Sequence, residues 1–167
     1  MDNGLLIAII SPILLTIGGL VTWIIKAKRE ELLTQEEKSR DFRIRTYETL
    51  LEPYIGLFTF NLTEQKKDKE IQKIGSIEYK KAAFNLTTFG SDEVVKAFNK
   101  LMQSFYHKKS DDYENKNDWG IMMLTVFSDF LLAIRRDLYS KNTKLKRSQL
   151  VEFMITDIED YRKIVDK

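Results

Sequence analysis

The feature that most constrains this chain is an uninterrupted apolar segment near its N-terminus. From Leu5 to Ile25 the sequence contains no charged side chain. About 20 helical residues, at a rise of about 1.5 Å each, match a bilayer hydrocarbon core about 30 Å thick. We therefore expect residues 5–25 to form one transmembrane helix, preceded by a short extracytoplasmic tail at residues 1–4.

The charges at the two ends of this segment predict its orientation. Lys26, Lys28 and Arg29 follow the apolar run directly, whereas the tail before it contains no Lys or Arg. The positive-inside rule then places everything after the segment in the cytoplasm. A cleavable signal peptide would carry positive charge before the apolar run, but Asp2 stands there. We expect an uncleaved anchor in the inner (plasma) membrane, with the N-terminus outside.

Small side chains recur on one face of the predicted span. Ser11, Leu15, Gly18 and Thr22 follow one another at steps of three and four residues, a pattern that lets transmembrane helices approach closely. This face predicts a homo-oligomer. The alternative is that the small residues have no partner, since glycine and proline are common in membrane helices. The span has no ionisable side chain, which argues against a transporter or a proton relay.

The rest of the chain, about 140 residues, is enough for one domain with one core. The net charge of the whole chain, +2, gives no overall field for nucleic-acid binding, so any basic site must be local. The absence of cysteine excludes disulfides and thiolate metal sites. The single histidine, His107, has no second histidine or cysteine to act with. We therefore expect no catalytic residue, no metal and no cofactor.

Hydrophobic spacing predicts an all-α fold after the anchor. Residues 26–41 are nearly all polar, with opposite charges at helical spacings, which predicts a helical stalk. From residue 42 to 167 apolar side chains recur every three or four residues, which predicts a cytosolic bundle of about four to five helices. We expect Pro53 to kink or interrupt the first of them.

Capping residues and polar runs predict where the other helices begin and end. Gly90 ends a helical pattern that starts at Ile71, and Ser91 is placed to cap the next helix. Ser148 is placed to cap a single final helix. The predicted connections are polar: a turn at Glu64–Glu70, a loop at Lys108–Asp118 and a basic loop at Lys141–Arg147.

The segment Leu131–Leu138 has the least usual composition of the soluble part, because Arg135 and Arg136 follow an apolar helix face. One of these arginines could pair with Asp137, or with Asp41 or Glu48 on a neighbouring helix. The other hypothesis is that both arginines bind a phosphate-bearing ligand together with basic residues of the following loop. Those loop residues are Lys141, Lys144, Lys146 and Arg147. The same loop could instead contact anionic lipid headgroups.

The layout resembles a widespread set of small bacterial single-pass membrane proteins without an assigned activity. The likeness rests on the run Leu131–Leu138 and on the stretch from Asn85 to Phe98, which contains Asn-Leu-Thr followed by Ser-Asp-Glu-Val. It implies an N-terminal anchor and a cytosolic helical domain. In layout alone, the chain is also similar to small membrane effectors of antiviral, CRISPR-type systems, in which a cytosolic domain binds a cyclic oligonucleotide.

These observations favour a non-enzymatic, membrane-anchored sensor or effector. Its bundle would bind a ligand or a protein partner, with an anionic nucleotide as the expected ligand class, and its oligomerised anchor would act on the inner membrane. The alternative is a passive scaffold that holds a protein-interaction bundle at the bilayer. A third hypothesis is an enzyme of unfamiliar type.

Overall fold

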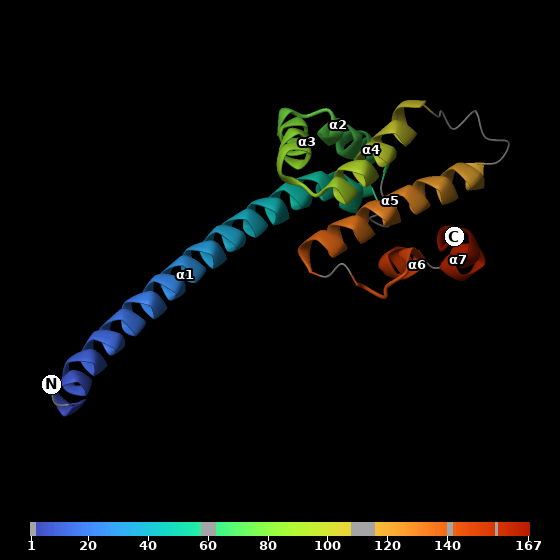
Figure 1. Cartoon of the computed structure of the whole chain (residues 1–167). Helices are drawn as coiled ribbons and strands as arrows, with labels where there is room; N and C mark the ends of the chain where they lie inside the picture. Colours follow the sequence, from blue (N-terminus) through green and yellow to red (C-terminus); the bar gives the residue numbers. More distant parts are fainter. Residues whose placement is uncertain (1–2, 58–62, 108–115, 140–141, 156) are drawn as a thin grey trace. The chain divides into compact units, whose positions relative to one another are not determined.

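The computed structural model describes residues 3–57, 63–107, 116–139, 142–155 and 157–167. Within these ranges the chain contains seven α-helices, one short 3-10 helix and no strand, which confirms the predicted all-α class (Figure 1). The helices are α1 (Asn3–Leu57), α2 (Glu64–Ile74), α3 (Ile77–Phe89), α4 (Asp92–His107), α5 (Lys116–Leu138), α6 (Arg147–Val151) and α7 (Ile158–Val165), and the 3-10 helix η2 (Glu152–Met154) lies between α6 and α7.

The chain separates into two compact units, Met1–Phe42 and Arg43–Lys167, and α1 contributes to both. In the first unit every side chain described, from Thr16 to Phe42, is exposed. The Thr22 hydroxyl donates to the Gly18 carbonyl at 2.8 Å, and Lys26 lies 4.0 Å from Glu30. The side chains of Ser11 and Leu15 lie outside the described part.

In the part of the chain whose side chains are described, no helix is both long enough and apolar enough to cross a membrane. The predicted span 5–25 is only partly covered by that description, which begins at Thr16 for side chains.

Pro53 does not interrupt α1, contrary to one form of the sequence prediction. The helix continues through Pro53 to Leu57, and the proline side chain is fully buried. Proline removes one backbone hydrogen bond from a helix. Burial of the neighbouring Leu50 and Tyr54, at 0% and 3% exposure, supplies stabilisation that offsets this loss.

The predicted polar turn at Glu64–Glu70 is wrong, because these residues belong to α2. No residue of α2 is buried. Ion pairs one turn apart, Lys67 with Glu64 and Lys73 with Glu70, both at 2.9 Å, support this polar helix, and Ile74 at its end packs against the core. The expected helix from Ile71 to Phe89 is consequently split, since Gly75 caps α2 and Ser76 caps α3.

The boundary between α3 and α4 follows the sequence prediction. The Gly90 N–H donates to the Leu86 carbonyl at 2.8 Å, and α4 begins directly after Ser91. A Cβ added at Gly90 would lie 2.6 Å from the Leu86 carbonyl oxygen. Glycine therefore permits the close approach that ends α3 at this point.

Helices α4 and α5 pack against each other and form the centre of the second unit, and α6 and α7 contact α5 (Figure 1). Phe130 of α5 is completely buried, and its ring lies 5.5 Å from the ring of Phe98 on α4. The same core includes Tyr47, Leu50 and Tyr54 from the last turns of α1. These contacts fix α4 and α5 relative to each other.

The single final helix predicted from Ser148 is wrong, since the chain forms α6, η2 and α7 in succession. Ile155 has an extended backbone and ends η2. Ser148 is not the N-cap of α6, which is Lys146. The Ser148 hydroxyl and backbone N–H both donate to Asp166, at 2.9 and 3.0 Å, so this serine joins α6 to the residue that caps α7. Two of the predicted helices are therefore split. As a result, the second unit contains more helices than the expected four to five.

Candidate functional site: a basic groove between α4 and α5

A groove of about 490 Å³ lies along α4 and α5, and we call it the α4–α5 groove. Each of the two helices contributes four side chains at spacings of three, four and seven residues, which place them on one helical face. The lining residues are Glu93, Lys96, Ala97 and Lys100 of α4, Asp129, Leu132, Ala133 and Arg136 of α5, and Leu145, Lys146, Arg147 and Asp166 of the C-terminal segment.

Two of the acidic side chains in the groove already have partners. Asp129 accepts from Lys100 at 2.9 Å and from the Nε of Arg147. Asp166 accepts from the backbone and side chain of Ser148. These contacts hold the C-terminal segment against α5. Lys96, Arg136 and Lys146 of the groove form no ion pair with a carboxylate among the described residues.

Arg136 is the side chain best placed to bind an added anion. Its Nε is buried and has no hydrogen-bond partner, and Arg136 forms no ion pair with any residue that the structure describes. A buried donor without a partner costs about 1 to 3 kcal/mol, so such groups usually have an acceptor. The five cations and three carboxylates of the groove leave a formal charge of +2. An anion in the groove would satisfy both the unpaired donor and the excess charge.

The structure separates the six basic residues that the sequence grouped as a phosphate site. Arg136, Lys146 and Arg147 line the groove. Arg135 is exposed, and its Nε donates to the Thr143 hydroxyl at 3.3 Å. Lys144 is exposed and does not line the groove, and Lys141 lies outside the described residues.

Two lysines of α4, Lys96 and Lys100, were missed by the sequence analysis. The signal was present, since Glu93, Lys96 and Lys100 occupy one polar face of a clearly predicted helix. The spacing of these residues does not indicate which helix packs against this face of α4. The pairing of α4 with α5 supplies that information.

Asp137 has a different partner from those expected. Arg135 and Arg136 were the expected partners, but residues one or two positions apart on a helix point about 100° or 200° apart and do not face each other. Asp137 instead accepts from Arg43 of α1, with both carboxylate oxygens 3.0 Å from Nη1. The Tyr47 hydroxyl, one turn further along α1, donates to the same carboxylate at 2.7 Å. Burial, and then the hydrogen bond to Asp137, raise the pKa of Tyr47 above its usual range.

Replacing Asp137 by asparagine should lower the free energy of unfolding by about 2 to 3 kcal/mol. The carboxylate is 5% exposed, and its loss leaves the Arg43 guanidinium, 26% exposed, without its counter-ion. Urea unfolding of the full chain in detergent micelles measures this difference. The matched control is Tyr47→Phe, which removes one hydrogen bond and should cost only about 1 kcal/mol. An Asp137→Asn protein as stable as the wild type would contradict a structural role for the pair.

Among the described residues there is no group of His, Asp and Glu side chains arranged to hold a metal ion. The side chain of His107 lies outside them, although its backbone ends α4.

No protein-family model, no curated protein and no solved structure matches this chain.

Proposed function

We propose that this protein is a membrane-anchored, non-enzymatic sensor or effector whose helical bundle binds a phosphate-bearing anion in the α4–α5 groove. The observation that carries the proposal is Arg136, a guanidinium with a buried, unpartnered Nε in a groove of formal charge +2. Arginine binds phosphate oxygens through several N–H groups in a fixed planar arrangement, which makes it well suited to this ligand class.

The size and lining of the groove favour a nucleotide over a free phosphate ion. A volume of about 490 Å³ lies within the range of pockets that hold cofactor-sized ligands, about 300 to 1,000 Å³. Leu132, Ala133 and Leu145 add apolar surface between the cations, on which a base or ribose could lie. A cyclic oligonucleotide, the ligand class suggested by the layout of the chain, combines phosphodiesters with such surfaces.

The proposed anchor is the uncharged segment Leu5–Ile25. Lys26, Lys28 and Arg29 would hold the following residues in the cytoplasm, and the small-residue face containing Gly18 and Thr22 would associate the anchors. In this proposal a ligand bound to the groove changes the association of the bundles. The oligomerised anchors then act on the inner membrane.

Arg136→Gln should weaken anion binding by about tenfold or more. The substitution removes a charged donor whose hydrogen bonds are worth about 1.5 to 3 kcal/mol each. Isothermal titration of the full chain in lipid nanodiscs, with a panel of cyclic oligoadenylates and with inorganic pyrophosphate, measures the affinity. Arg135→Gln is the matched control, because Arg135 is the adjacent, exposed arginine and should leave the affinity within about twofold of wild type.

Two outcomes would contradict the proposed site. One is that no member of the panel binds at millimolar concentration. The other is that both arginine variants lose affinity equally, which would indicate a diffuse charge effect. For a specific site, raising the salt concentration should weaken binding of the wild type, and the difference between the variants should remain.

The alternative function is a membrane-tethered scaffold for a protein partner. It is favoured by the exposed aromatic side chains of α3, where Phe84 is 76% and Phe89 57% exposed. A stoichiometric partner captured from cells and lost in Phe84→Ser, but retained in Arg136→Gln, would favour the scaffold. The reverse pattern would favour the anion sensor.

A further inference from the structure

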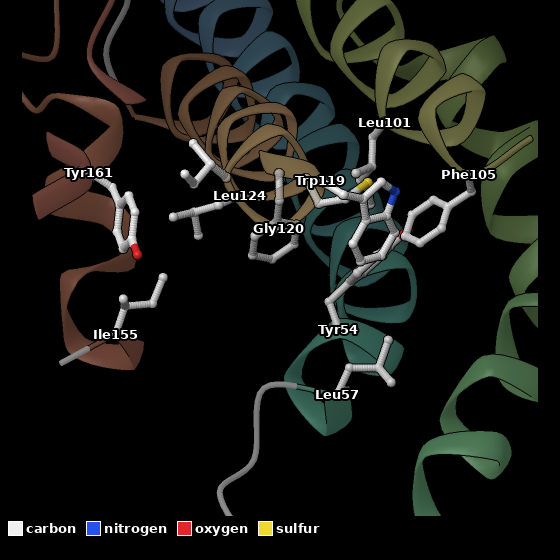
Figure 2. Close-up of a pocket in the computed structure, with 12 residues that line it drawn as sticks. Tyr54, Leu57, Leu101, Phe105, Trp119, Gly120, Leu124, Ile155 and Tyr161 are labelled. Carbon is white, nitrogen blue, oxygen red and sulfur yellow. The ribbon is translucent and has the colours of Figure 1, made fainter. Parts of the chain in front are cut away.

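A second cavity, of about 420 Å³, lies at the N-terminal half of α5 and shares no lining residue with the α4–α5 groove. We call it the aromatic pocket. None of its lining residues is charged. Figure 2 shows Trp119, Phe105 and Tyr54 close together on one side and Tyr161 with Ile155 on the other. The pocket therefore offers ring surfaces on two sides.

The polar side-chain groups of this pocket are the hydroxyls of Tyr54 and Tyr161 and the indole N–H of Trp119. The Tyr54 hydroxyl is already engaged with the Tyr79 hydroxyl at 3.2 Å. Burial raises the pKa of Tyr54 above its usual range, so this hydroxyl stays neutral at physiological pH. The Nε1 of Trp119 is buried and has no hydrogen-bond partner in the described structure. An indole N–H can only donate, so this group lacks an acceptor.

The charge and size of the pocket restrict its occupant. A carboxylate would lose its hydration without gaining a counter-ion from the lining, which excludes carboxylates. An ammonium group has no lone pair with which to accept the indole N–H of Trp119, so it would leave this donor unpaired. A helix is about 10 to 12 Å across with its side chains, which is too wide for a cavity of this volume. Apolar pockets of a few hundred Å³ with one or two fixed polar groups are typical of small-molecule sites.

We propose that the aromatic pocket binds a neutral, mainly apolar small molecule whose single hydrogen-bond acceptor, such as a ketone or ester carbonyl, accepts the indole N–H of Trp119. The ring surfaces contact the apolar body of the ligand, and the indole fixes its orientation. This site is separate from the anion site, so the failure of one proposal does not affect the other.

A pair of bicyclic probes tests the proposal, 1-indanone with a carbonyl and indane without one. The chain contains two tryptophans, so the full chain in micelles should give two indole N–H cross-peaks in a ¹H–¹⁵N spectrum. We expect 1-indanone to shift the Trp119 cross-peak downfield in a saturable manner. Indane should shift it less and not downfield. The shift of the Trp23 cross-peak reports partition of the probes into the micelle, and it should not reach a plateau as the probe concentration rises.

Two pairs of variants locate the binding. Trp119→Phe keeps a ring but removes the donor, so 1-indanone should bind about five- to tenfold more weakly while indane is unaffected, as followed by the methyl resonances of Ile155 and Leu124. Gly120 lines the pocket, and an added Cβ would meet no atom within 4 Å. Gly120→Leu should therefore abolish binding of both probes by filling the pocket, whereas Gly120→Ala should leave it nearly unchanged.

Three results would overturn the proposal. The first is an equal response of the Trp119 cross-peak to both probes. The second is undiminished 1-indanone binding by Gly120→Leu. The third is a chemical shift of the Trp119 cross-peak that depends on protein concentration when no probe is present. In that case a side chain of a second copy would fill the pocket.

Discussion

Replacing Phe130 by alanine is expected to lower the free energy of unfolding by about 4 kcal/mol. Phe130 is completely buried in α5 and its ring contacts Phe98 of α4, so truncation leaves a cavity at the centre of the second unit. This is a large fraction of the total stability of a typical domain, about 5 to 15 kcal/mol. Urea unfolding of the full chain in micelles, followed by circular dichroism, measures the change.

Phe153→Ala is the matched control for this experiment, because it removes the same side chain at a position that is 81% exposed. It should change stability by no more than about 0.5 kcal/mol. Equal effects of the two substitutions would show that α4 and α5 do not form the core. The groove would then lose its structural basis, since its two walls are the faces of these helices.

Deleting residues 5–25 should move the protein completely from the membrane fraction to the soluble fraction. The deletion removes the whole uncharged segment but leaves the second unit, Arg43–Lys167, intact. Cell fractionation with an alkaline carbonate wash measures the distribution of the full chain and the deletion variant. A reporter fused after Lys167 should give cytoplasmic signal only. A full chain released by the carbonate wash would disprove the proposed anchor, while the proposals for the bundle would remain testable.

The sequence predicted helices well where apolar side chains recur every three or four residues and a capping residue marks the end of the helix. Gly90 and Ser91 separate α3 from α4 in this way, and the apolar face of α5 was evident from Ile121 to Leu138. Prediction failed where a helix buries little. The polar helix α2 resembled a loop because none of its residues is buried and its charged side chains form ion pairs, within the helix and from Lys73 to Glu52 of α1.

In the C-terminal segment the sequence predicted too long a helix. The apolar residues recur at helical spacing without interruption, although the helix is broken there. Ile155 and Ile158 fit the spacing of a single helix, but the backbone is extended at Ile155. The contacts of Ser148 with Asp166 are made between residues 18 positions apart. A local pattern contains no information about such a contact.

The candidate site was predictable in part. Composition singled out Arg136 and the basic loop, and the different directions of Arg135 and Arg136 follow from their adjacent positions on one helix. The partner of Asp137 was not predictable, since Arg43 lies 94 residues away and on another helix. Assigning one of several cations to a given carboxylate requires knowledge of which helices pack together.

The most direct test of the anion site observes the buried donor of Arg136 itself. In a ¹H–¹⁵N spectrum of the full chain in nanodiscs, the side-chain Nε–H resonance of Arg136 is identified by its loss in Arg136→Gln. On addition of the tightest-binding cyclic oligoadenylate, we expect a saturable downfield shift of this resonance and no shift of the Arg135 Nε–H resonance. An Arg136 Nε–H resonance that does not shift while the ligand binds would contradict binding through Arg136.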